Sequence, residues 1–127
     1  MALYAQTSGT HSTNSGSFVP IPDLSLTLPG GAGGSMLVIL NLPNPYASGN
    51  NYPGAQFGIS AGGVTSPVQA CFTSGVQSPS SSGRVPTTLV VSIALTDASQ
   101  TITAMWAGVR GSTVTIDTPA TLSATFG

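Results

Sequence analysis

Only five charged side chains occur in this chain of 127 residues, two arginines and three aspartates, which is 4% of the sequence against about 25% in an ordinary soluble domain. The net charge of −1 excludes the basic surface on which nucleic-acid binding and attraction to anionic membranes depend. This length suits a single domain over residues 1–127, and because a near-neutral surface does little to hold copies apart, we expect a closed oligomer.

The N-terminal segment does not resemble a secretory signal peptide, since MALYAQTSGTHSTNSG has neither a basic start nor an apolar stretch. The longest apolar run, residues 36–40, is far too short to cross a bilayer. We therefore expect a soluble protein without membrane insertion. It would be made in the cytoplasm, and export to the cell surface or the extracellular space would need another route.

The first half of the chain predicts two strands and one long loop. Residues 8–17 are small and polar, which is typical of a flexible arm or loop. Residues 24–28 alternate between apolar and polar and predict a strand. Residues 36–41 are apolar on both faces and predict a central strand covered on two sides. Residues 43–54 contain three prolines and three asparagines and predict an ordered loop of the kind that carries function.

The second half predicts further strands separated by turns. The expected strands cover residues 55–61, 67–73, 87–95, 101–109, 112–117 and 121–126, and a second polar loop covers residues 74–86. Within 101–109 the residues expected on one face are Ile102, Ala104, Trp106 and Gly108. Nine or ten short strands at this spacing predict an all-β sandwich or jelly roll.

The residues that enzymes and metal sites need are scarce here. His11 falls in the polar arm, and Cys71, the only cysteine, follows an apolar pattern that predicts a buried structural thiol. A Cys71–His11 dyad would therefore be a poor nucleophile pair. No metal-binding motif occurs, and the three aspartates are scattered. We expect no catalysis, no metal and no cofactor.

The remaining polar groups suit the recognition of a neutral polyol. Sugars present vicinal hydroxyls and an apolar C–H face, which guanidinium donors, Ser and Thr hydroxyls and aromatic rings complement. Loops 43–54 and 74–86, together with Arg110, hold such groups. The alternative is that Arg84 and Arg110 pair with Asp97 and Asp117 as structural braces. Composition alone does not decide between binding and bracing.

Four blocks of sequence carry a resemblance to a known family. They are PYASGNNYPG at 45–54, ACFT at 70–73, SSSGRVP at 80–86 and VRGSTVTID at 109–117. In this order and spacing the chain resembles the N-terminal TNF-like, fucose-binding lectin domains of Burkholderia superlectins. The similarity runs from residue 36 to residue 127 almost without gaps, and residues 1–35 match loosely.

The resemblance implies a TNF-like jelly-roll sandwich that assembles as a three-fold homotrimer, with a calcium-independent fucoside site between protomers. By position, one protomer would contribute Tyr46, Ser81, Ser82 and Arg84, and its neighbour would contribute Thr73 and Arg110. Both cations of the chain would then lie in one pocket. Asp117 also matches a family position, where it would orient Arg110 through a charge-assisted bond.

Three positions depart from the family pattern. Gln56 and Ser74 replace two tyrosines at the pocket, and Gln69 replaces an acidic residue that would reach beyond the fucose. The loss of aromatic walls removes apolar contact, so lower affinity or altered selectivity is expected.

We therefore expect a trimeric, non-catalytic lectin for fucose or fucosylated glycans. Two other classes stay open at this point: a structural jelly-roll assembly subunit that binds no glycan, and a TNF-type ligand that engages a protein receptor. The sparse charges argue against a steered protein interface.

Overall fold

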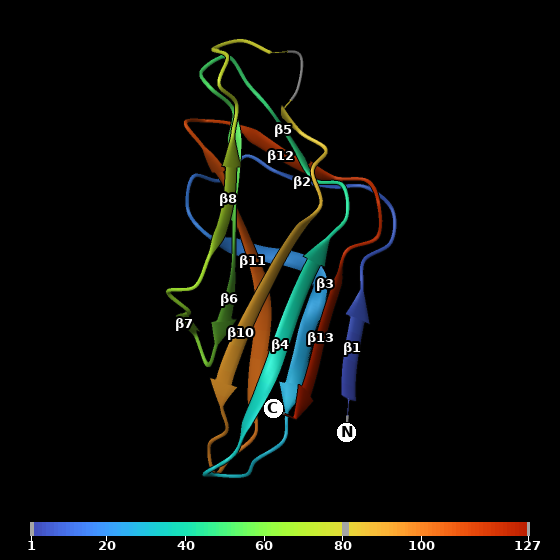
Figure 1. Ribbon diagram of the computed structural model, residues 1–127, viewed down its shortest axis with the longest axis vertical. Coiled ribbons are helices and arrows are strands. Elements are labelled where there is room, and N and C mark those ends of the chain that lie inside the picture. The colour runs from blue at the N-terminus through green and yellow to red at the C-terminus, as the bar shows by residue number, and fades with distance from the viewer. Residues whose placement is uncertain (1, 80–81, 127) are drawn as a thin grey trace.

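The computed structural model describes residues 2–79 and 82–126, which form an all-β fold of thirteen strands in three antiparallel sheets (Figure 1). The first sheet has the order β1 (Ala2–Gln6), β13 (Thr121–Phe126), β4 (Ser35–Leu42) and β10 (Thr87–Ala94). The second has the order β3 (Val19–Leu28), β11 (Gln100–Val109), β6 (Gly54–Ala61) and β7 (Val64–Thr65), with β8 (Ala70–Thr73) also paired to β6. The third has the order β2 (His11–Thr13), β12 (Thr113–Ile116), β5 (Tyr46–Ser48) and β9 (Ser82–Gly83).

The hydrophobic core lies between the first two sheets. Alternate residues of β10, β4 and β13 face alternate residues of β3, β11 and β6. On β11 the expected inward face is confirmed, since Ile102, Ala104 and Trp106 are at most 1% exposed. Full burial of one aliphatic side chain stabilises the fold by about 1.5–3 kcal/mol. The alternating pattern thereby determines which face of each strand points to the core.

The third sheet covers one end of this sandwich, the upper end in Figure 1. It includes residues 11–13, which the composition of the segment predicted as part of a flexible arm. These residues pair antiparallel with β12, and the hydroxyls of Ser12 and Thr115 lie 3.0 Å apart. A strand partner about 100 residues away in sequence thus orders a segment with no strand signal of its own. Most candidate site residues lie in or directly beside β5, β8, β9 and β12.

Two expectations about burial are wrong. Cys71 is exposed, because β8 turns Phe72 inward, where its ring centroid lies 6.1 Å from that of Phe57, and the alternation then directs Cys71 outward. The run that forms β4 is covered on one face only, and its outward Leu37 is 36% exposed.

The strand count also differs from the expected nine or ten, because five short strands gave no clear signal. The described residues contain no helix long and apolar enough to cross a membrane.

Candidate functional site

Backbone conformation sets apart the two cations of the chain. In the described part of the chain four residues other than glycine have left-handed φ angles, at Asp23 (67°), Tyr52 (47°), Arg84 (61°) and Arg110 (52°). This conformation is costly for L-residues, by roughly 1–2 kcal/mol per residue in a helix, and it concentrates at functional sites. Tyr52, Arg84 and Arg110 therefore hold strained conformations that the surrounding structure maintains.

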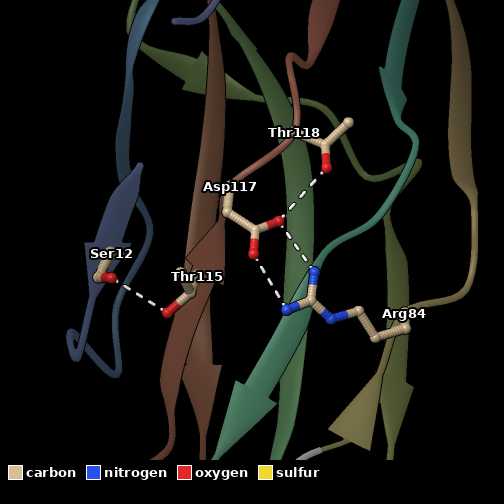
Figure 2. Close-up of polar contacts among 5 residues, drawn as sticks. All are labelled: Ser12, Arg84, Thr115, Asp117 and Thr118. Carbon is tan, nitrogen blue, oxygen red and sulfur yellow. Dashed lines mark hydrogen bonds and ion pairs between the residues drawn. The ribbon is translucent and has the colours of Figure 1, made fainter. Parts of the chain in front are cut away.

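Arg84 lies at the centre of the first group of candidate residues, which we call the Arg84 cluster: Tyr46, Ser82, Arg84 and Asp117. Figure 2 shows its guanidinium paired side by side with the Asp117 carboxylate, with Nη1–Oδ1 at 2.9 Å and Nη2–Oδ2 at 3.0 Å. The carbon between the guanidinium nitrogens also lies 4.0 Å from the centroid of the Tyr46 ring. A guanidinium has five N–H groups and the ion pair uses two, so three remain for other acceptors. Bidentate pairing and ring stacking fix the plane of the guanidinium.

The ion pair shifts the pKa values of both partners. The hydrogen bond from Arg84 is the largest effect on Asp117 and lowers the pKa of its carboxyl below the ordinary value. The hydrogen bond to Asp117 likewise raises the pKa of the Arg84 guanidinium. Arg84 and Asp117 keep side-chain exposures of 44% and 32%, so solvent screens the pair. The pair orients the guanidinium more than it stabilises the fold.

The backbone beneath Arg84 requires glycine. Gly83 pairs with Tyr46 across β9 and β5 and has a φ of 118°. A Cβ there would lie 2.6 Å from the Pro45 carbonyl oxygen and 2.9 Å from the Phe72 ring. Ser82, opposite Ala47 and half-buried, precedes it in β9. The predicted site residue Ser81 lies outside the described residues.

Arg110 lies at the centre of the second group, the Arg110 cluster: Tyr52, Thr73, Ser74 and Arg110. Its Nε donates to the carbonyl oxygens of Asn51 (3.1 Å) and Tyr52 (3.2 Å), and its Nη2 also donates to that of Tyr52 (2.5 Å). The guanidinium carbon lies 5.8 Å from the Tyr52 ring centroid. Within one chain the Asp117 carboxylate pairs with Arg84, whereas the family resemblance implied Arg110 as its partner. Uncharged carbonyls hold Arg110 instead.

Thr73 and Ser74 lie beside the loop that holds Arg110. Thr73 pairs with Gly54 at the end of β8, and the backbone N–H of Ser74 donates to the Pro53 carbonyl at 2.8 Å. The N–H of Tyr52 donates to the Gln77 carbonyl at 3.0 Å, so loops 43–54 and 74–86 brace each other. Thr73 is exposed and Ser74 is half-buried, with its hydroxyl bonded within its own turn to Val76.

Gln56 and Gln69, the other two positions that depart from the family pattern, are exposed. Gln56 lies opposite Cys71 in the β6–β8 pairing, and Gln69 bonds to the Ser66 carbonyl at 3.4 Å. Gln56 thus stands on the outward face of the second sheet, on the strand that begins beside the Arg110 cluster. A tyrosine at this position would have space to extend from the sheet.

Within one chain the candidate residues form two clusters rather than one pocket. Among the described residues no side-chain hydrogen bond or ion pair joins the Arg84 cluster to the Arg110 cluster. Figure 1 shows strands β5 and β12, which hold or adjoin residues of the Arg84 cluster, and the β5–β6 and β11–β12 connections, which hold Tyr52 and Arg110, at the same end of the sandwich. Each cluster combines a guanidinium, a tyrosine and hydroxyl groups, and each suits hydrogen bonding to a neutral polar ligand. Tyr52 was not predicted as a site residue, because only its left-handed backbone and its carbonyl bond to Arg110 reveal its role.

The two residues of the possible nucleophile pair lie on different sheets. His11 Nε2 is 2.8 Å from the Ser8 carbonyl oxygen on the edge of the third sheet, and Cys71 lies on β8 of the second sheet. No group of three or more His, Cys, Asp or Glu side chains in the described ranges is placed to hold a metal ion.

Comparison with known proteins gives one family match. The family model described as Bc2l-C, N-terminal domain matches residues 3–125. No curated protein matches the chain. The chain is similar to the insecticidal delta-endotoxin Cry8Ea1 of Bacillus thuringiensis, with a TM-score of 0.49 and 14% identity over 93% of this chain and 19% of the toxin. It is also similar to the CBM36-1 domain of a multidomain xylanase from the hindgut metagenome of Trinervitermes trinervoides, with a TM-score of 0.49 and 17% identity over 98% of this chain and 97% of that domain.

Proposed function

The chain belongs to the Bc2l-C N-terminal domain family, and we propose that it is a non-catalytic lectin that binds fucose, fucosylated glycans or a related neutral sugar. The site lies between the protomers of a homotrimer and needs no metal ion. The proposal combines family membership with the arrangement of the two arginine clusters.

The division of the candidate residues into two clusters is the observation that carries this proposal. The family resemblance assigns Tyr46, Ser82 and Arg84 to one protomer and Thr73 and Arg110 to its neighbour. In the single chain these residues fall into the same two groups, each around one strained arginine. A site completed by a second copy of the chain accounts for this separation.

Each cluster supplies a different part of the sugar contact. Arg84 has three N–H groups left beside its ion pair, and their direction is fixed by Asp117 and Tyr46. Arg110 adds a second fixed cation, and Thr73 adds an exposed hydroxyl. Hydrogen bonds to charged groups contribute about 1.5–3 kcal/mol each, so affinity per site is modest. Several sites on one trimer raise the apparent affinity by about 10²–10⁴ where the glycans are spaced to match.

One observation favours a second candidate function, a structural assembly subunit without a ligand. Arg84 does form an ion pair with Asp117, as a bracing role predicts. The pair is exposed, however, and exposed pairs contribute little to stability, about 0–1 kcal/mol. Bracing alone does not account for the left-handed backbone at both arginines.

A glycan array probed with the labelled chain in chelator-containing buffer tests the proposal, with the molar mass measured by light scattering in the same buffer. We expect signal confined to fucosylated structures and a mass of three copies of the 12.6 kDa chain. A trimer that gives a blank array would favour the structural subunit. Signal that requires added calcium would contradict metal independence, and a folded monomer that binds fucose would contradict the shared site.

A further inference from the structure

The outward face of the second sheet carries an ordered array of hydroxyl groups away from both arginine clusters. In the strand register, Ser25 of β3, Thr103 of β11, Ser60 of β6 and Thr65 of β7 stand in one row, in which Ser25 is exposed, Thr103 and Thr65 are half-buried and Ser60 is buried. The next outward row pairs Thr27 with Thr101. Neighbouring strands are about 4.8 Å apart, so the array places hydrogen-bonding groups at short, regular intervals.

An apolar row borders these hydroxyls on the same face. Met105 pairs with Pro20 on one side and with Gly58 on the other. The ring of Phe18 covers Gly58, with its nearest carbon 3.4 Å from where a Cβ would lie. Hydroxyl rows beside an apolar row match the two kinds of surface that a pyranose ring presents.

The two surfaces meet in an open hollow of about 530 Å³, a size typical of sites for small ligands. Residues that line it include Pro20, Ser60, Gln100, Thr101, Thr103 and Met105, and no lining residue carries a charge. The β6–β7 turn and the start of β11, which border the hollow, lie in the lower half of Figure 1, opposite the third sheet. The hollow is therefore separate from the arginine clusters.

Polar groups in the hollow are held in place before any ligand arrives. The Gln100 Nε2 donates to the Ala94 carbonyl at 2.9 Å, which fixes the amide, and among the described residues no hydrogen bond occupies its Oε1. The Thr103 and Ser25 hydroxyls lie 3.1 Å apart. Fixed groups lose less conformational entropy when a ligand binds.

The fourth strained residue borders the same region. The β3–β11 register shifts between Thr103, which pairs with Ser25, and Met105, which pairs with Pro20, and Asp23 lies in the irregular stretch of β3 between them. Asp23 has a φ of 67° and is exposed. Bulges and left-handed residues concentrate near functional sites. The remaining strained residues all belong to the arginine clusters, so backbone strain occurs only at these two places in the described part of the chain.

We propose that this hollow is a second binding site, which takes an uncharged saccharide. The lining offers hydroxyl and amide groups that donate and accept, an apolar row for C–H groups, and no cation to attract an anionic ligand. Asp23 does not line the hollow but follows its lining residue Pro20 in β3, where its carboxylate would accept hydrogen bonds from hydroxyl groups and repel acidic sugars. This site is complete within one chain and does not depend on the arginine clusters or on a trimer.

An NMR titration of the ¹⁵N-labelled chain tests this second site, with glucose, galactose, mannose, fucose and cellohexaose as neutral probes and glucuronate as the acidic control. We expect at least one neutral probe to shift the amide signals of Gln100, Thr101 and Thr103, with glucuronate causing no shift. Thr101→Val with Thr103→Val removes two hydroxyls at nearly constant shape and should weaken binding by about tenfold. Gln100→Leu serves the same purpose if the double variant does not fold.

Two controls separate this site from the proposed fucose site. Thr88→Val makes the same change on the first sheet, where the Thr88 hydroxyl bonds to Asn41 at 3.0 Å, and should leave the titration unchanged. Arg84→Ala should abolish fucoside binding at the first site and leave the shifts at Thr101 and Thr103 intact. The second site is refuted if no neutral probe shifts these signals, if glucuronate binds better than the neutral sugars, or if Arg84→Ala removes the shifts.

Discussion

Each of the two arginine clusters combines an arginine, a tyrosine and hydroxyl groups, but different partners hold the two guanidinium groups. Arg84 is paired with a carboxylate and stacked at 4.0 Å on Tyr46, whereas Arg110 is held by the carbonyls of Asn51 and Tyr52, with the Tyr52 ring 5.8 Å away. Both guanidinium groups are thus oriented, but only the charge of Arg84 is compensated by a carboxylate in the same cluster. The comparison indicates that orientation is the shared requirement and that net charge is not.

Loss of either guanidinium should have the largest effect on sugar binding. We expect Arg84→Ala and Arg110→Ala each to weaken fucoside binding by more than about 100-fold, because each removes charged hydrogen bonds to the ligand. Calorimetry measures the affinity, and light scattering confirms a folded trimer. Collapse of the trimer in both variants would support bracing. Arg110→Lys keeps the charge without the planar fork, so binding that survives this change would show that orientation matters less than charge.

Removal of the Asp117 carboxylate should affect the Arg84 cluster and leave the Arg110 cluster unchanged. Asp117→Asn removes the charged partner of Arg84, and we expect fucoside binding to weaken by about tenfold. The amide NMR signals of Arg110 and Tyr52 should stay unchanged. Asp97→Asn makes the same chemical change at an exposed turn residue and should have no effect. Equal losses in the two variants would attribute the effect to net charge rather than to the position of Arg84.

Restored aromatic rings should strengthen the Arg110 side of the site. Gln56→Tyr and Ser74→Tyr each add an apolar wall, and we expect the pair to tighten fucoside binding by about three- to tenfold. Calorimetry on each single variant apportions the gain, because the Ser74 hydroxyl also holds its own turn. No gain from Gln56→Tyr would contradict the placement of this position beside the sugar.

The smallest expected effect is the acid response of the ion pair. The pKa of Asp117 is lowered by Arg84, so the pair stabilises the fold above the ordinary carboxyl value of 3.8 and is lost as the pH falls through the lower folded value. Any difference in Tm between the wild type and Asp117→Asn should therefore be constant from about pH 5 to pH 8 and should disappear at the acid end. A difference that grows on acidification would reverse the sign of the linkage.

Most long strands were predictable and the shortest ones were not, and β3 was predicted only from residue 24 although it begins at Val19. Alternation over eight to ten residues locates β10 and β11 within one or two residues of their observed ends. In contrast β2, β5, β7 and β9 contain two or three residues each, and the partners of β2, β5 and β9 lie far away in sequence. Cys71 illustrates the same limit, since the pairing of β8 with β6 decides which of two neighbouring apolar residues points inward.

The candidate site was predictable in its residue types but not in its geometry. The scarcity of charge and the family resemblance together selected Arg84 and Arg110. The partner of Asp117 and the contribution of Tyr52 depend on tertiary contacts and on left-handed backbone angles, which the local sequence does not reveal. The family resemblance already implied the division between Arg84 and Arg110, whereas the place of Asp117 beside Arg84 required the structure.

The way in which the two arginines are held also bears on the rate at which a ligand associates. Arg84 is paired with Asp117, and Arg110 is held by uncharged carbonyls. A surface with so few net charges projects almost no long-range field, so an approaching glycan is not steered toward the loops. Encounter then depends on diffusion and on the fraction of collisions with the right orientation, and the association rate should hardly change with ionic strength. A receptor of this kind would work equally well in fresh water and in seawater.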